Sequence, residues 1–287
     1  MKTGIATCTL DVNGYGRWKE DTYKKIKEHG YDCSDFDIAD TDSEIYTLPQ
    51  EESDKILLHE KALAEEAGIE ISQVHGPWRW PPRDYTKEDR AERLEKMQKS
   101  IRAASVIGCK NWVIHPIMPF GVDDLDTGDA QKTWDMNIEF MGELLKTAKE
   151  YGVTICLENM PMLRFSLSTP EQILKFVEAI DDENLKICLD TGHVSVFEEL
   201  NLAEEVLRLN DKIRVLHVHD NRNSIDLHMM PYHGIIDWEA FYKALAQIGF
   251  DGSLSLETMP SKKLPTYIFE EMCISLAKIA KEITKSV

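Results

Sequence analysis

The sequence predicts an α/β fold in which residues 1–287 form a single (β/α)8 barrel, and three observations favour it. The chain has 287 residues, which suits one such barrel of about 250 residues. Short apolar segments alternate with longer amphipathic segments along the whole chain, as expected for parallel strands joined by helices. Glycines recur at the ends of the amphipathic segments, at intervals that suit one strand plus one helix.

The glycines mark the ends of the predicted helices. Gly30, Gly68, Gly108, Gly152 and Gly249 each close an amphipathic segment and precede an apolar one. A glycine just after a helix commonly takes the left-handed conformation that ends it. The first four lie 38, 40 and 44 residues apart, and the 97 residues between the last two leave room for two further units. We therefore expect eight strand–helix units and a closed barrel.

Apolar segments predict the eight strands in chain order. We place them at residues 4–10, 33–36, 69–74, 112–114, 155–157, 186–190, 213–217 and 254–256. Three of the other segments show the clearest helical spacing of apolar residues, at 94–104, 173–180 and 269–283. Before the second of these, Thr169 suits a helix cap and Pro170 suits the first helical position. We interpret all three apolar stripes as part of the core.

Composition limits the partners and the location of the protein. Hydrophobic residues make up 43% of the chain, and no segment has the composition of a linker. The net charge of -18 disfavours nucleic acid and anionic membranes as partners. The first residues do not resemble a signal peptide, no segment is apolar enough to span a membrane, and the six cysteines show no paired spacing. We expect a cytoplasmic protein with reduced thiols. The oligomeric state stays open, and an exposed apolar patch on the ring of helices would be consistent with a homo-oligomer such as a dimer.

Polar side chains follow seven of the predicted strands, at the barrel face where the active sites of this fold lie. In chain order they are Asp37, His75, His115, Glu158, Asp190, His217 and Glu257. Each one alone could cap a helix or pair with a lysine. Together they predict a shared site, because a carboxylate or imidazole at the end of a buried strand is costly unless a metal or a substrate uses it.

Four residues of this set predict a divalent-metal site, namely Glu158, Asp190, His217 and Glu257. Three carboxylates and one imidazole suit Mn²⁺, Co²⁺, Mg²⁺ or Zn²⁺ and disfavour copper(I). We therefore expect one of these divalent ions as the cofactor.

Further residues could bind a substrate or a second metal. His193 follows the sixth predicted strand, and it could ligate a metal, contact a substrate oxygen, or be a turn histidine bonded to the backbone. The same alternatives apply to His75 and His115. Asp226 and His228, two residues apart on an extended segment, could point to the same side, toward the site.

Two arginines and two tryptophans are further candidates for substrate contacts. Arg222 and Arg164 could bind an anion or a hydroxyl group, or could be solvated side chains on the surface. Trp78 and Trp80 could stack on a sugar face, although an aromatic pair in a loop more often contributes to packing.

Five short motifs are similar to those of a known family, namely Leu157-Glu158-Asn159, Leu189-Asp190-Thr191-Gly192-His193, His217-Val218-His219-Asp220-Asn221, Asp226-Leu227-His228 with Gly234-Ile235-Ile236-Asp237-Trp238, and Leu256-Glu257-Thr258. On these motifs the chain resembles the xylose isomerase-like TIM-barrel superfamily over essentially its whole length, and within it the sugar and sugar-phosphate isomerases and epimerases. For ketose 3-epimerase and hydroxypyruvate isomerase relatives, the resemblance implies that Glu158, Asp190, His217 and Glu257 hold one divalent metal. It also implies that His193 contacts the substrate and that Glu158 and Glu257 transfer protons.

The chain is also similar to the abasic-site DNA endonucleases of the same superfamily (the AP endonuclease family 2 barrels), which have a three-zinc cluster. That resemblance implies further ligands at His75, His115, His193, Asp226 and His228, and all of them are present. The ligand set therefore does not exclude a zinc hydrolase. The acidic net charge favours a sugar enzyme, because a DNA enzyme neutralises phosphates with Lys and Arg.

One departure from the family concerns a loop. Relatives often have a Gly-x-Gly turn before Ile-Asp-Trp, whereas this chain has Tyr232-His233-Gly234. This difference favours a loop shaped for a different substrate.

These features lead to the hypothesis of a metal-dependent isomerase or epimerase that acts on a small carbohydrate. The metal would bind two adjacent substrate oxygens and stabilise an enediolate. One of Glu158 and Glu257 would remove the proton next to the carbonyl, and the other would return it. A hydride shift, a multi-zinc hydrolase or lyase, and a non-catalytic sugar-binding barrel stay open as alternatives.

Overall fold

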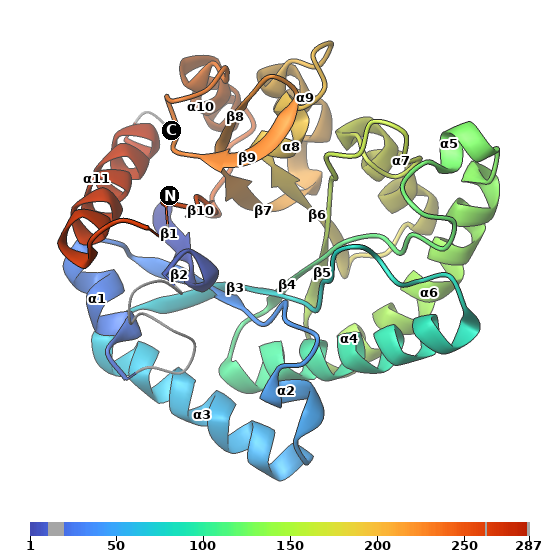
Figure 1. The fold of residues 1–287 in the computed structure, drawn as a ribbon, viewed down its shortest axis with the longest axis horizontal. Coiled ribbons are helices and arrows are strands. Elements are labelled where there is room, and N and C mark those ends of the chain that lie inside the picture. The colour runs from blue at the N-terminus through green and yellow to red at the C-terminus, as the bar shows by residue number, and fades with distance from the viewer. Residues whose placement is uncertain (11–19, 262, 286–287) are drawn as a thin grey trace.

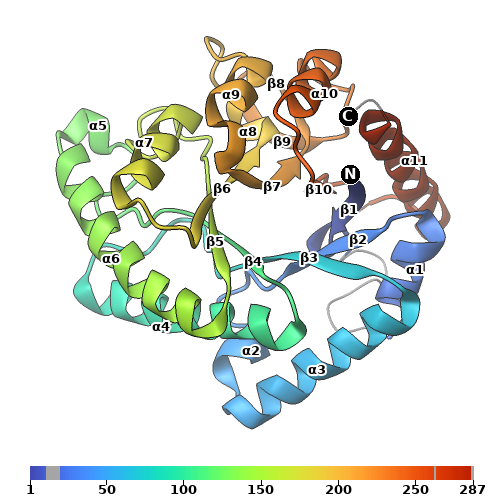
Figure 2. The same cartoon turned by 180° about the vertical axis from the view of Figure 1, so that it is seen from behind.

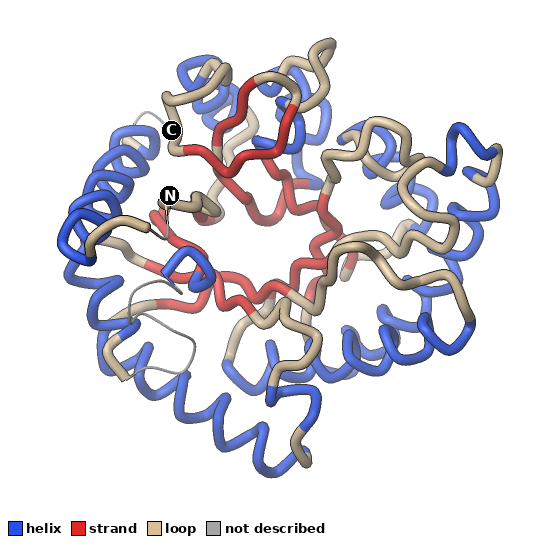
Figure 3. The backbone as a smooth tube through the Cα atoms, in the orientation of Figure 1, coloured by secondary structure: helices blue, strands red, loops and turns tan. Residues whose placement is uncertain are grey.

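Eight parallel strands close into a barrel in the computed structural model, which describes residues 1–10, 20–261 and 263–285. Around the barrel the strands follow the order β1-β10-β7-β6-β5-β4-β3-β2, and Figure 3 shows them as a ring inside the helices. Their bounds are β1 Lys2–Ala6, β2 Cys33–Asp37, β3 Glu70–His75, β4 Asn111–Ile114, β5 Thr154–Glu158, β6 Leu185–Asp190, β7 Ile213–Val218 and β10 Ser253–Leu256. The predicted (β/α)8 fold class is confirmed.

Helices surround this ring and connect successive strands (Figures 1 and 2). The longer ones are α1 Thr22–His29, α3 Gln50–Ala67, α4 Lys87–Ile107, α6 Ala130–Tyr151, α7 Pro170–Ile180, α9 Leu202–Leu209, α10 Trp238–Gln247 and α11 Thr266–Thr284. Shorter helical segments are η1 Thr7–Leu10, α2 Glu44–Thr47, α5 Asp124–Thr127, α8 Thr191–Ser195 and η2 Asn210–Lys212. A two-stranded antiparallel hairpin, β8 Asp220–Arg222 with β9 Ile225–Met229, follows β7 at the carboxyl end of the barrel.

The predicted glycine caps are confirmed at four helices. Gly30, Gly68, Gly108 and Gly152 follow α1, α3, α4 and α6 with φ of 102°, 66°, 91° and 64°. Each donates its backbone N–H to carbonyls of the last helical turn, as a left-handed cap does. Helix α7 instead ends at Asp181, whose φ of 52° is also left-handed.

The prediction that the opening strand extends over residues 4–10 is wrong at its far end. Strand β1 ends at Ala6, and residues 7–10 form the short helix η1. At this point the side chain of Thr7 accepts the backbone N–H of Asp37 at 2.9 Å. The side chain thus takes over the pairing with β2 that the backbone of a longer strand would make.

Strand side chains alternate between two apolar regions. Trp112 and Ile114 belong to the large core between the barrel and the helices, whereas Val113 belongs to a separate buried cluster. The other members of that cluster are Cys156, Cys188 and Val215. Since successive side chains of a strand point to opposite faces, this cluster fills the barrel interior. Within the described part of the chain, no helix combines the length and apolarity needed to cross a membrane.

Candidate active site

Four predicted site residues form the next layer of the barrel interior. Residues i and i+2 of a strand point to the same face. Two residues beyond the apolar cluster of Val113, Cys156, Cys188 and Val215, the same strands present His115, Glu158, Asp190 and His217. The polar layer is therefore a direct continuation of the apolar one toward the carboxyl face.

The structure brings the four predicted metal ligands together. Glu158, Asp190, His217 and Glu257 each offer one ligand atom, and these atoms lie within 4.8 Å of one another. His217 Nδ1 lies 3.0 Å from Glu158 Oε1 and 3.1 Å from Glu257 Oε2. The first three residues are buried and Glu257 is partly exposed. Glu257 is therefore the most accessible of the four.

Asp35 and Gln73 support His217 from its other side, and the sequence reasoning missed both. Asp35 Oδ2 lies 2.9 Å from His217 Nε2, and Gln73 Nε2 donates to the same oxygen at 2.9 Å. With Nε2 held in this way, Nδ1 is the imidazole nitrogen that faces the carboxylates of Glu158 and Glu257. A carboxylate behind a ligating histidine fixes its tautomer and orientation.

Asn159 fixes the end of the strand that presents Asp190. The amide of Asn159 accepts the backbone N–H of Asp190 at 2.8 Å and donates to its carbonyl at 3.1 Å. Asp190 in turn accepts the backbone N–H of His193 at 2.7 Å and so caps helix α8. Asp190 and His193, which are neighbours in the sequence, are thereby held in one rigid turn.

Three of the predicted histidines point the same ring atom toward the cavity. The Nδ1 atoms of His75, His193 and His228 lie 2.7–2.8 Å from the carbonyl oxygens of Gly76, Asn159 and Glu257. An Nδ1–H that donates to a backbone carbonyl leaves Nε2 available for a metal or for a substrate oxygen.

A second group of ligand-type side chains lies beside the first. It consists of His193, His219, Asp226 and His228. Asp226 Oδ2 lies 3.4 Å from His193 Nε2 and 3.3 Å from His228 Nε2. His219, which the sequence reasoning did not select, stacks on His228 at 4.1 Å, and its Nε2 lies 3.1 Å from Asp190. The two groups therefore meet at Asp190.

The ionisation of these groups indicates that the site requires positive charge. Burial alone would raise the pKa of the Glu158 carboxyl, but His217 and His115 hold it well below its usual range. Burial would lower the pKa of His193, yet Asp190, Asp226 and Glu158 raise it to about 10. A divalent cation can supply the same positive charge in place of such protons, so the charge of the site and its donor atoms fit a metal.

His115 differs from the other histidines. Burial lowers the pKa of its imidazole to about 4 despite the neighbouring Glu158, so this ring is neutral at pH 7. Its Nε2 lies 3.0 Å from Glu158 Oε2. A neutral His115 can therefore donate to the Glu158 carboxylate and hold its side chain in place.

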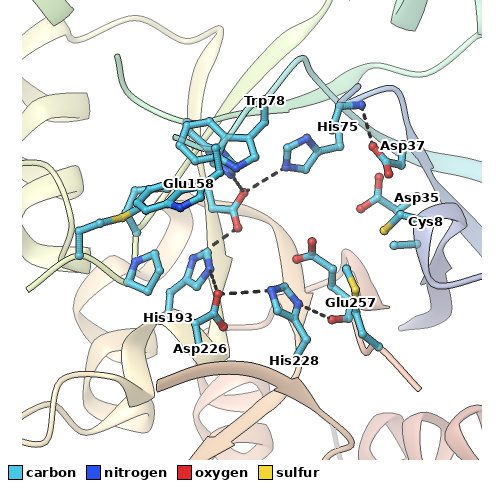
Figure 4. Close-up of a pocket in the computed structure, with 18 residues that line it drawn as sticks. Cys8, Asp35, Asp37, His75, Trp78, Glu158, His193, Asp226, His228 and Glu257 are labelled. Atoms are coloured by element: carbon cyan, nitrogen blue, oxygen red, sulfur yellow. Dashed lines mark hydrogen bonds and ion pairs between the residues drawn. The ribbon is translucent and has the colours of Figure 1, made fainter. Parts of the chain in front are cut away.

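A cavity of about 580 Å³ opens over these groups. Figure 4 shows Trp78 beside Glu158, and His75 next to Asp37 with Asp35 and Cys8 close by, whereas His193, Asp226 and His228 lie along the bottom of the view. Five carboxylates and four histidines line this cavity. It is a concave, largely preformed pocket of the size that small-molecule sites have.

Neither predicted arginine reaches the cavity. Arg222 is exposed at the tip of the β8–β9 hairpin, where its guanidinium donates to the carbonyl of His233 at 2.7 Å. Arg164 is exposed and pairs with Asp126 at 2.7 Å. The structure therefore places Arg222 outside the lining of the cavity, and a substrate contact by Arg222 stays a prediction. Both arginines are exposed on the surface, in agreement with the alternative interpretation as solvated side chains.

Comparison with known proteins places the chain in a family. A family model described as the xylose isomerase-like TIM barrel matches residues 23–275. The chain belongs to this family. The uncharacterized protein MJ1311 of Methanocaldococcus jannaschii is 31% identical over 239 residues, which are 82% of this chain and 77% of that protein.

Relatives with named activities are more distant. D-psicose 3-epimerase of Ruminiclostridium cellulolyticum is 27% identical over 204 residues, 69% of this chain and 66% of that protein. Probable endonuclease 4 of Mycoplasmopsis agalactiae is 27% identical over 207 residues, 68% and 71% of the two chains. The crystal structure of a D-tagatose 3-epimerase-like protein matches with a TM-score of 0.74 at 25% identity, over 98% of this chain and 99% of that one. Both branches expected from the sequence are thus among the relatives.

Proposed function

We propose that this protein is a divalent-metal-dependent epimerase or isomerase of a small carbohydrate. The observation that carries the proposal is the convergence of Glu158 and Glu257 on one imidazole, at 3.0 and 3.1 Å from His217 Nδ1. Glu158 ends β5 and Glu257 directly follows β10, and β6 and β7 separate these two strands in the barrel. The two glutamates therefore approach the site from different sides, as two bases that act on opposite faces of one substrate must. The named epimerase relatives support the same function.

Glu158, Asp190, His217 and Glu257 are the residues that would hold the metal. When bound there, Mn²⁺, Co²⁺, Mg²⁺ or Zn²⁺ supplies Lewis-acid stabilisation of the negative charge that develops on the substrate carbonyl oxygen. One of the two glutamates removes the proton from the carbon next to the carbonyl, and the other delivers a proton to the opposite face or to the neighbouring carbon. The low pKa of Glu158 keeps its carboxylate ionised, the form that a base requires.

The surrounding histidines orient the substrate in this proposal. With its Nδ1 bonded to the Gly76 carbonyl, His75 can use Nε2 to bond to a sugar hydroxyl. Nε2 of His193 and of His228 lies 3.4 and 3.3 Å from Asp226 Oδ2, so a hydroxyl would have to compete with that carboxylate. The net charge of -18 supports a small neutral ligand rather than nucleic acid. We further propose one catalytic domain over residues 1–287 and a cytoplasmic location, which the six free cysteines support.

Deuterium exchange tests the proposed proton transfer. The metal-loaded protein in D2O should incorporate solvent deuterium at the carbon next to the carbonyl of a ketose substrate. In Glu257→Gln, the rate should fall by about 100-fold or more, because an amide cannot accept the proton. Elemental analysis of the variant separates loss of the base from loss of the metal, and Glu239→Gln on the exposed face of α10 is the matched control. Undiminished deuterium incorporation by metal-loaded Glu257→Gln would refute its role, and turnover of the wild type without any exchange would indicate a hydride shift.

A multi-metal hydrolase is the second candidate, and two observations favour it. The group of His193, His219, Asp226 and His228 could hold a further ion beside the first site. His75 and His115 also lie 3.7 and 3.0 Å from Glu158 Oε2. This alternative requires two or three zinc ions per chain and cleavage of a phosphodiester.

A further inference from the structure

The cavity has a second half that the proposed proton transfer does not use. Carboxylates and imidazoles line one part of the cavity, and apolar side chains line the other part. We call this second part the apolar wall and define it as Trp78, Trp80, Met160, Met162 and Met259. A wall of indole rings and thioethers offers a sugar ring few hydrogen bonds but a large apolar contact area.

Trp78 is the fixed part of the apolar wall. Its backbone N–H donates to the carbonyl of Ala39 at 2.7 Å, and its ring packs edge-on against His115 at 4.4 Å. The guanidinium of Arg93 lies 5.7 Å from the same ring. Since His115 contacts Glu158, the wall begins directly beside a proposed catalytic residue.

Trp80 and Met259 are the exposed part of the wall. The ring of Trp80 lies 6.3 Å from that of Trp78 at an angle of 41°. Trp80 is 63% exposed and Met259 46% exposed, so much of their apolar surface contacts solvent. Covering such surface with a ligand is favourable by about 25 cal/mol per Å². The geometry thus offers a platform for a group attached to the reacting sugar.

The side chains around the apolar wall disfavour an anionic group at this position. None of the described residues that line it is Lys or Arg, and five are carboxylates. The nearby Arg93 is buried in an ion pair with Asp84 and also donates to the carbonyls of His115 and Pro116. The apolar wall itself offers a phosphate ester no charged partner.

We propose that the natural substrate is an uncharged sugar derivative with a second ring, whose apolar face packs against the apolar wall. This proposal rests on the proposed function and names its substrate class. The cavity of about 580 Å³ supports it, because that volume lies in the range of about 300–1,000 Å³ that suits ligands larger than one sugar ring. The second ring is a sugar or an aromatic group, since both present a flat apolar face.

A series of ketoses that differ only at O6 tests the substrate class. We would measure kcat/KM for solvent deuterium exchange by the Mn²⁺-loaded protein on D-fructose, D-fructose 6-phosphate, isomaltulose (a glucosyl group on O6) and 6-O-benzyl-D-fructose. One or both of the ring-bearing ketoses should exceed D-fructose by at least about 10-fold, a modest discrimination for an apolar contact. The glucosyl and benzyl compounds distinguish a sugar from an aromatic second ring. Equal or faster exchange of D-fructose, or preference for the phosphate, would overturn the proposal.

Trp80→Ala assigns the preference to the wall. This variant should lose the advantage of the ring-bearing ketoses over D-fructose, and it should still fold because exposed Trp80 contributes little to the core. Tyr267→Ala, which removes an exposed aromatic ring on α11 outside the cavity, should change neither rate. An unchanged preference in Trp80→Ala would contradict the assignment.

Binding separates this proposal from the proposed function. Suppose that no ketose exchanges deuterium, so that the proposed epimerase function fails. We would then measure quenching of tryptophan fluorescence by 6-O-benzyl-D-fructose. Quenching in the wild type that is absent in Trp80→Ala would still support the apolar wall as a binding surface. Absence of both exchange and quenching would overturn the wall as well.

Discussion

Asp35 fixes the imidazole of His217, although it is not one of the four proposed metal ligands. It is buried, and its Oδ2 contacts both His217 Nε2 and Gln73 Nε2. Its negative charge makes the imidazole a stronger donor toward a cation at Nδ1. Metal affinity should therefore depend on Asp35 even though this residue does not touch the ion.

We expect Asp35→Asn to weaken metal binding by about 10–100-fold, the usual effect of removing such a support. Competition with a chromophoric chelator measures this affinity without any assay of activity. Asp37→Asn is the matched control, because Asp37 lines the same cavity but accepts the backbone N–H of Ala39 instead. Equal affinity in Asp35→Asn and the wild type would show that Asp35 does not support the site.

Most of the candidate site could be predicted from single residues at strand ends. Glu158, Asp190, His217 and Glu257 follow apolar segments directly, so the sequence placed them at one face of the barrel. Other members of the site were missed although the alternation of strand side chains signals them. Asp35, Gln73 and His219 each lie two residues from Asp37, His75 and His217, and thus on the same face. The position of Arg222 outside the cavity could not be foreseen, because sequence spacing does not define the direction of a hairpin.

At the scale of elements, the loop between β9 and α10 depends on one buried carboxylate. Asp220 accepts the backbone N–H groups of Gly234, Ile235 and Ile236 and the indole N–H of Trp238. A Cβ at Gly234 would lie 2.2 Å from Asp220 Oδ1, so only glycine fits there. Tyr232, at the first position of the family's Gly-x-Gly turn, has a φ of 72°. Tyr232 thus adopts a left-handed conformation that glycine takes more readily. That this loop is shaped for a different substrate stays a prediction.

Helix α3 contains a buried carboxylate that makes stability depend on pH. Glu60 is 3% exposed, and burial raises the pKa of its carboxyl above the ordinary value of 4.5, only partly offset by Tyr23 and His59. A group with a raised pKa stabilises the folded state below its ordinary pKa, and this contribution is lost as pH rises through the folded-state pKa.

Glu60→Gln should therefore stabilise the protein at neutral pH by about 0.5–2 kcal/mol, because it removes a buried charge. Thermal unfolding from pH 4 to pH 8 measures the effect. The gain in Tm should appear at pH 7–8 and vanish near pH 4, where Glu60 is protonated in both states. Glu65→Gln, on the exposed side of the same helix, should show no such dependence. A Tm lowered equally at every pH would contradict this account.

At the scale of the whole molecule, the barrel could be predicted because its repeat is local. Each glycine cap and each apolar strand depends on a few neighbouring residues, so eight units could be counted along the chain. The shorter first strand could not be predicted, because it depends on a contact between Thr7 and the distant Asp37. The apolar wall likewise combines loops from three parts of the chain.

Metal content per chain tests the central claim most directly, because the proposed function depends on a divalent ion at Glu158, Asp190, His217 and Glu257. We would purify the protein without chelator, reload it with each of Mn²⁺, Co²⁺, Mg²⁺ and Zn²⁺, and measure bound metal by elemental mass spectrometry. The account predicts one tightly bound ion per chain, which Asp190→Asn should lose and exposed Asp126→Asn should keep. Two or three zinc ions per chain would favour the hydrolase instead. No bound metal after reloading would contradict both functions.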